Sequence, residues 1–164
     1  MGTETPEKHR ISRSREENRG IIASLVANAR REIKVFAPVL DPFYFNTPAM
    51  EQTLTGFVLA HSQNRVQVLI EDIRALLLDQ ARLVGLHRRL SGRIEIRRVD
   101  DDAVGQREFF VVADGRGYFH QIDYEGRESS AEFDAAGEAA LLRRHFEELW
   151  ERSARISDLH TTGL

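Results

Sequence analysis

Three side chains in the second half of the chain could bind or process a charged ligand: Arg107, Asp114 and His120. An arginine binds phosphate well, often through two parallel hydrogen bonds. A histidine beside a carboxylate could relay a proton for a nucleophile. The nearby hydroxyls of Ser129 and Ser130 lie in no nucleophile motif such as Gly-x-Ser-x-Gly. The pattern therefore favours ligand binding over acyl transfer, with a surface arginine and a hydrogen-bonded histidine as the structural alternatives.

A loop rich in aromatic residues, DPFYFNTP at 41–48, follows the first predicted strand. Ligands in open α/β sheets gather at the carboxyl ends of strands. Asp41 and Tyr44 are therefore further candidates for ligand binding. The alternative is that Phe43 and Phe45 pack in the core or in a dimer contact.

Basic residues are concentrated between residues 87 and 98, where Arg88, Arg89 and Arg97 are candidates for contact with nucleic acid. Such clusters are also typical of exposed faces that pair with Asp and Glu. The formal net charge of -3 argues against general attraction to nucleic acid or to an anionic membrane. Any nucleic-acid binding would need a local patch.

Neither metal nor cofactor chemistry is indicated by the residue pattern. The chain has no cysteine, and its six histidines are scattered without a motif such as His-Glu-x-x-His. The acidic run at 100–102 lacks EF-hand spacing. We therefore expect no metal and no cofactor.

The location and source are predicted from composition. No apolar run approaches the roughly 18 residues that cross a bilayer, and the N-terminus lacks the apolar core of a secretory signal. These features predict a cytoplasmic protein without membrane contact. Lys8 and Lys34 are the only lysines, which is typical of coding bias in a GC-rich genome and fits a bacterial source.

Hydrophobic periodicity predicts alternating helices and strands within one domain. The predicted helices cover about 14–31, 48–61, 73–90 and 133–153, and the predicted strands cover 33–40, 66–72, 93–99, 108–114 and 117–123. This order predicts an α/β fold with a mixed, mostly parallel sheet flanked by helices. The predicted domain covers residues 13–155, between a disordered tail at 1–12 and a C-terminal tail at 156–164. In the last helix, Trp150 should be largely buried beside Phe146 and Leu142.

The chain resembles one half of a phospholipase D-like domain over about residues 16–153. That family carries His-x-Lys-x4-Asp on a strand and the turn after it, and REFFVVAD at 107–114 is similar to this strand. RVQVLIED at 65–72 resembles the second strand, and AALLRRHFEELWERS at 139–153 resembles the final helix. The order of the elements also matches.

The resemblance fails at the residues that do chemistry in the family. If Asp114 occupies the Asp place, Arg107 stands at the His place and Phe109 at the Lys place. Gln121 and Ile122 stand where the family has Gly-Ser. In the family one histidine attacks phosphorus and another protonates the leaving group, whereas a guanidinium stays protonated and a phenyl ring cannot hold an anion.

These observations predict a non-catalytic phospholipase D-like binding or regulatory module. The alternatives are a phosphodiesterase-type enzyme with a non-standard site and a nucleic-acid-binding domain that uses the arginine cluster. Because catalytic relatives combine two halves and this chain resembles one, we expect a homodimer. A different protein partner is the alternative.

Overall fold

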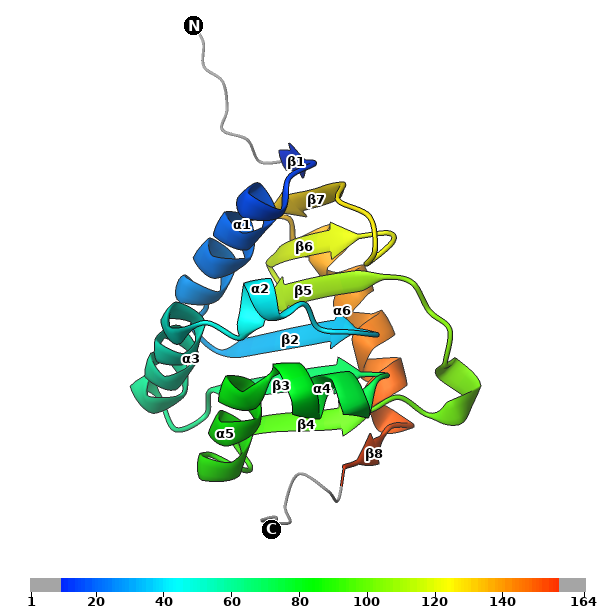
Figure 1. The fold of residues 1–164 in the computed structure, drawn as a ribbon. Coiled ribbons are helices and arrows are strands. Elements are labelled where there is room, and N and C mark those ends of the chain that lie inside the picture. Colours follow the sequence, from blue (N-terminus) through cyan, green and yellow to red (C-terminus); the bar gives the residue numbers. More distant parts are fainter. Residues whose placement is uncertain (1–9, 157–164) are drawn as a thin grey trace, which may run out of the picture.

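One sheet of eight strands runs through the part of the chain that the computed structural model describes, residues 10–156 (Figure 1). The strands are β1 (Arg10–Ser12), β2 (Glu32–Ala37), β3 (Arg65–Ile70), β4 (Ile94–Arg98), β5 (Phe109–Ala113), β6 (Gly117–Gln121), β7 (Ser129–Glu132) and β8 (Ala154–Arg155). The helices are α1 (Arg15–Ala27), α2 (Pro42–Phe45), α3 (Pro48–Ala60), α4 (Ile73–Asp79), α5 (Ala81–Arg89) and α6 (Ala136–Glu151), with a 3-10 turn η1 at Asp101–Ala103.

The strand order is β1-β7-β6-β5-β2-β3-β4-β8. The pairs β2–β3 and β3–β4 are parallel, whereas the five other pairs among the described residues are antiparallel. The prediction of a mixed sheet flanked by helices is confirmed. The expectation that most pairs are parallel is wrong for two reasons. Strand β5 pairs antiparallel to β2 as well as to β6, and three short strands that were not predicted each pair antiparallel to their neighbours.

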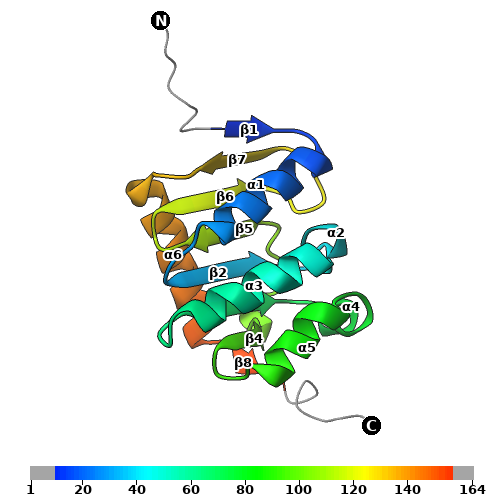
Figure 2. The same cartoon turned by 90° about the vertical axis from the view of Figure 1, so that its left-hand side faces the viewer.

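The helices form two unequal layers (Figure 2). Helices α1 to α5 cover one face of the sheet, and α6 alone crosses the other. The larger core lies under α1 to α5, and a smaller core under α6 contains Phe36, Phe110 and Phe146. Trp150 is only partly buried, and its ring stacks on Phe146 and faces the Arg97 guanidinium at 4.3 Å. The prediction of a largely buried Trp150 is therefore wrong in degree.

Several element ends follow from the local sequence. The Ser14 hydroxyl accepts the N–H of Glu17 at 3.0 Å, which caps α1. The predicted helix at 73–90 is two helices, because the backbone leaves helical geometry at Gln80. Asp114 and Gly115 both have positive φ and make the turn between β5 and β6.

Most of the two predicted tails lies outside the described residues. Of the tail residues that are described, Arg10–Ser12 pairs with β7, and Ile156 is 4% exposed and belongs to the larger core. The domain limits at 13 and 155 otherwise stay a prediction.

Candidate functional site

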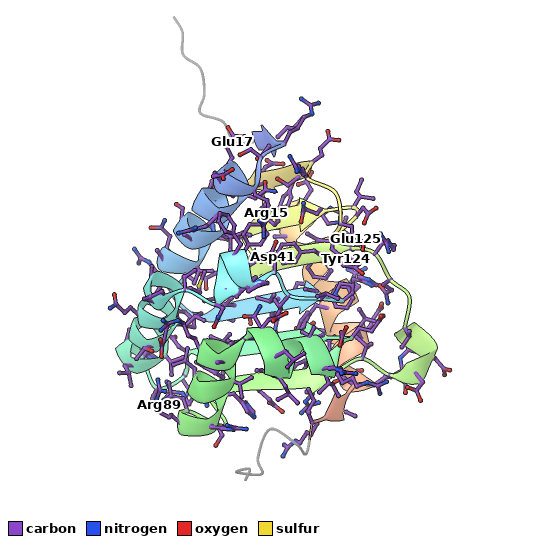
Figure 3. The ribbon with its side chains drawn as sticks, viewed as in Figure 1. Arg15, Glu17, Asp41, Arg89, Tyr124 and Glu125 are labelled. Carbon is purple, nitrogen blue, oxygen red and sulfur yellow. The ribbon has the colours of Figure 1, made fainter. Side chains whose placement is uncertain are left out.

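The predicted ligand residues at 41, 44 and 107 lie at the same end of the sheet. This end holds the last residues of β2, the first residues of β5 and the loop after β6. Figure 3 shows Arg15 and Asp41 close together, with Tyr124 and Glu125 in the loop that follows β6. Arg15, Asp41 and the pair Tyr124 and Glu125 come from three separate stretches of the chain, so only the folded protein assembles this surface.

Asp41 is held by its own helix and by Arg15. Its Oδ1 accepts the N–H of Phe43 at 2.9 Å and so caps α2. Arg15 Nη2 donates to Oδ1 at 2.7 Å and to Oδ2 at 2.8 Å, and this hydrogen bonding raises the pKa of the guanidinium. The guanidinium carbons of Arg15 and Arg19 each lie 4.5 Å from the centre of the Phe43 ring. Both oxygens of Asp41 are therefore occupied.

Tyr44 belongs to a buried hydrogen-bond chain. Its side chain is buried, and burial raises the pKa of the phenol. The Asn18 amide, fully buried, donates from Nδ2 to the Tyr44 hydroxyl at 3.3 Å and to the Arg127 carbonyl at 3.1 Å. Ser129 Oγ donates to Asn18 Oδ1 at 2.7 Å. This chain ties α1, α2 and β7 together and gives Tyr44 and Ser129 structural partners.

Phe109, at the place of the family's lysine, is a core residue. It is 4% exposed and stacks on Tyr44 with ring centres 6.0 Å apart and planes at 11°. Phe45 and Phe119 complete the cage at 6.2 and 5.3 Å. No open space for a phosphate remains around this side chain, because aromatic rings cover it on three sides.

Arg107, at the place of the family's histidine, is an exposed cation between two carboxylates. Its Nη2 donates to Asp123 Oδ1 at 2.8 Å and to Glu125 Oε1, and its guanidinium carbon lies 4.9 Å from the Tyr124 ring centre. Hydrogen bonds to Glu125 and Asp123 raise the pKa of Arg107. The backbone N–H of Glu125 and the Arg107 guanidinium lower the pKa of Asp123. Arg107 is therefore permanently charged and already paired.

Asp114 and His120 do not share this site. Arg107 and Asp114 lie seven residues apart at opposite ends of β5, which is about 23 Å in an extended strand. Asp114 instead accepts backbone N–H bonds from Arg30, Arg31 and Glu32 at 2.8 to 3.2 Å.

His120 faces the α6 side of the sheet, opposite Phe110 in the ladder. Its Nε2 bonds Glu108 Oε2 at 2.8 Å, and His145 of α6 approaches the other oxygen of Glu108 at 3.6 Å. The expected approach of His120 to Asp114 is therefore wrong, because the register places Gly117 opposite the residue before Asp114.

The three nucleic-acid candidates do not form one surface. Arg89 pairs with Glu51 at 3.5 Å, on the face covered by α1 to α5. Arg97 pairs with Glu95 at 2.9 Å and faces Trp150 of α6, on the opposite face of the sheet. Arg88 is exposed on α5. The sheet separates Arg97 from the other two.

Sequence reasoning missed Arg15 and Asn18. Asn18 carries a detectable signal, because it continues the spacing of Ile22 and Leu25 on the buried face of α1. A polar residue in that stripe indicates a buried hydrogen bond. Arg15 carries no such signal, since its partner Asp41 is 26 residues away.

The described residues form neither a metal-binding cluster nor a membrane-spanning helix. Among residues 10–156, no group of three or more His, Asp or Glu side chains is arranged to hold a metal ion. None of the described helices has the length and apolar character that a bilayer crossing needs.

Known proteins resemble this chain in fold. A family model described as "Domain of unknown function (DUF7931)" matches residues 14–161. No curated protein matches the sequence at a significant level. Nuc from Salmonella typhimurium, a phospholipase D family member, has a TM-score of 0.64 and 15% identity, over 90% of this chain and 97% of Nuc. NucT from Helicobacter pylori has a TM-score of 0.65 and 11% identity, over 91% of this chain and 99% of NucT.

TrmBL2, an archaeal chromatin protein whose structure shows a novel mode of DNA binding, has a TM-score of 0.66 and 16% identity. The match covers 93% of this chain and 56% of TrmBL2, so the chain spans little more than half of that protein. Identities this low show the fold alone. The predicted phospholipase D-like fold is confirmed.

Proposed function

This chain belongs to the DUF7931 family, and on that premise we propose that it is a phospholipase D-like binding module without phosphodiesterase chemistry. The packing of Phe109 carries the proposal. At the place where phospholipase D enzymes hold phosphate with a lysine, this chain has a buried ring inside a cage of three aromatic side chains. Neither charge nor space for a phosphate is left there.

The surroundings of Arg107 support the same conclusion. A nucleophile must lose its proton and a general acid must titrate near the working pH. The Arg107 guanidinium does neither, because two carboxylates raise its pKa further. The same carboxylates, Asp123 and Glu125, would repel a phosphate that approached Arg107.

The test is turnover of three substrates: bis-p-nitrophenyl phosphate, phosphatidylcholine vesicles and single-stranded DNA. A catalytically competent phospholipase D relative serves as the positive control. We expect no product above a blank with any substrate. Turnover that disappears in His120→Ala, but persists in the control His61→Ala on the opposite side of the molecule, would establish a non-standard catalytic site and overturn the proposal.

We also propose a homodimer that uses the end of the sheet where Arg107 lies. Strand β5 is paired on both sides, so Phe109 and Val111 cannot lie at a free edge, and both are buried. A dimer contact at β5 would therefore have to be made through the end of this strand. That end presents the half-buried Phe43 ring and the exposed Arg107.

A further inference from the structure

Three loops lead from a helix into the parallel strands, and arginine closes each of them. Residues 28–31 (NARR) connect α1 to β2, residues 61–65 (HSQNR) lead from α3 into β3, and residues 90–93 (LSGR) connect α5 to β4. None of these loops contains Asp or Glu. The pattern recurs in all three helix-to-strand connections of the parallel part of the sheet.

The folded structure places these loops side by side. Strands β2, β3 and β4 are parallel neighbours, so their first residues share one end of the sheet, on the left in Figure 1. The Arg65 N–H donates to the Arg31 carbonyl at 3.2 Å, and the Val66 N–H donates to the Arg93 carbonyl at 2.9 Å. Since neighbouring strands lie about 4.8 Å apart, the arginines follow one line across the strand starts.

The guanidinium groups in this line bond carbonyl oxygens. Arg31 donates to the Arg30 carbonyl at 3.0 Å, and Arg65 donates to the carbonyls of Ser62 and Asn64 at 2.8 and 2.9 Å. Within residues 10–156, neither these two side chains nor that of Arg30 forms an ion pair with a carboxylate. Arg15, Arg89 and Arg107, in contrast, are each paired with Asp or Glu.

The negative groups nearby reduce the positive charge of the line without cancelling it. Asp114 directs its oxygens at three backbone N–H groups, and Glu32 pairs with Arg143 at 2.8 Å. Each helix C-terminus adds roughly half a negative charge. Arg93 is half-buried and donates to the carbonyls of Val58 and His61 at the end of α3 and of Asn64 in the loop after it, so it acts mainly as a helix cap. The exposed arginines that remain for a ligand are Arg30, Arg31 and Arg65.

We infer that this arginine row, Arg30, Arg31 and Arg65, binds the phosphate backbone of nucleic acid without reading its sequence. A line of cations matches a linear array of phosphates. Exposed amide and hydroxyl side chains of the kind that contact phosphate oxygens lie in the same loops, at Asn28, Ser62, Gln63 and Ser91. The loops contain no Phe, Tyr or Trp on which a base could stack. Their one imidazole, His61, accepts the Gln63 N–H through Nδ1 at 3.0 Å.

An anionic membrane fits this surface less well. Membrane-surface segments combine basic residues with an apolar face that enters the interface. The exposed residues of the three loops are polar, and Leu59 at the end of α3 is an isolated exposed apolar neighbour, 67% exposed. The row lies at the end of the sheet opposite Arg107 and Phe109, on which the proposed function rests. The inference therefore does not depend on whether the chain has phosphodiesterase activity.

The test is fluorescence anisotropy of a short labelled DNA duplex of mixed sequence, titrated with the full chain at several salt concentrations. Three phosphate contacts predict a slope of about -2.7 for the logarithm of the binding constant against that of the salt concentration. Affinity should then fall about 40-fold between about 50 and 200 mM salt. A duplex of different sequence should bind equally well.

A charge-matched pair of variants separates a local surface from net charge. The triple substitution Arg30→Gln, Arg31→Gln and Arg65→Gln should weaken binding at low salt more than tenfold and bring the slope close to zero. The control Arg74→Gln, Arg144→Gln and Arg152→Gln changes the net charge equally at exposed sites elsewhere, and should leave binding nearly unchanged. A triple Arg→Lys variant of the row keeps the charge and should keep the slope.

Three results would overturn the inference. The first is no duplex binding at low salt, and the second is an equal loss of binding in both Gln triples. The third is binding of the wild type to phosphatidylserine vesicles without binding to DNA, which would assign the row to a membrane. Cleavage of the duplex while it is bound would instead contradict the proposed function alone, since binding itself would persist.

Discussion

Replacement of Asp114 by alanine should destabilise the fold strongly. The Asp114 carboxylate accepts the backbone N–H groups of Arg30, Arg31 and Glu32, at shortest distances of 2.9, 2.8 and 3.1 Å. It therefore fastens the start of β2 to the turn between β5 and β6. The Asp114 backbone also has a φ of 58°, in the left-handed region that aspartate tolerates better than alanine.

The expected cost is the sum of two effects. Three lost hydrogen bonds contribute about 1 kcal/mol each, below the usual value for a charged acceptor because water can reach this half-exposed site. Alanine in the left-handed region adds about 1 kcal/mol. We therefore expect Asp114→Ala to lower the free energy of unfolding by about 4 kcal/mol. Asp114→Gly removes the carboxylate but accepts the positive φ, so it should cost about 1 kcal/mol less despite its greater chain entropy.

Urea unfolding followed by far-UV circular dichroism measures both values. Asp102→Ala, an exposed acid in η1, is the matched control and should change stability by less than about 0.5 kcal/mol. A loss below about 1 kcal/mol in Asp114→Ala would refute the structural role. Asp114 would then be better explained as a ligand-binding residue, as its place in the motif first suggested.

Three further predictions test the aromatic core, an acid–base group and the assembly. Phe109→Ala should cost about 3–5 kcal/mol in urea unfolding, because it empties a full aromatic cage, whereas the control Val104→Ala at a half-exposed position should cost little; similar losses in both would contradict the cage. Burial raises the pKa of Tyr118 to about 12 from 10.0, so the folded state keeps this proton longer than the unfolded state. Wild-type stability should therefore fall relative to Tyr118→Phe as pH rises from 10.0 to about 12, and parallel pH profiles would argue against it. Sedimentation equilibrium should give about twice the 18.8 kDa chain mass, lowered in Phe43→Glu; a wild-type mass that stays at 18.8 kDa at tens of micromolar would exclude the dimer.

The periodic elements of the fold were predictable from the sequence because their hydrophobic faces repeat. Strands β2 to β6 and the helices α1, α3 and α6 lie close to their predicted ranges. The short strands β1, β7 and β8 have two to four residues and leave no periodic signal. Their absence from the prediction explains part of the wrong proportion of parallel pairs, since the missed strands are all antiparallel. The antiparallel pairing of β5 with β2 explains the rest.

The candidate site was predictable only where its residues are adjacent in the chain. The loop at 41–48 lies at the carboxyl end of β2, as expected from its place after the first predicted strand. The partners of its side chains are distant in sequence: Asn18 for Tyr44 and Arg15 for Asp41. The arginine row depends likewise on strand order, which no local pattern reveals.

Of the three positions of the phospholipase D motif His-x-Lys-x4-Asp, this chain keeps the Asp and replaces the His and the Lys. The different physical roles of these side chains explain the difference. Asp114, the one place that holds the family's residue, fastens three backbone N–H groups, and the fold needs these bonds whether or not chemistry occurs. The His and Lys places lie at the end of the sheet, where Arg107 is paired with two carboxylates and Phe109 joins the core. A chain under no requirement for phosphoryl chemistry gains stability by packing a ring there, because burying an aromatic side chain is favourable and burying an unpaired ammonium is costly. Phe109→Lys should therefore destabilise the protein without producing phosphodiesterase activity, since Arg107 would still lack a removable proton.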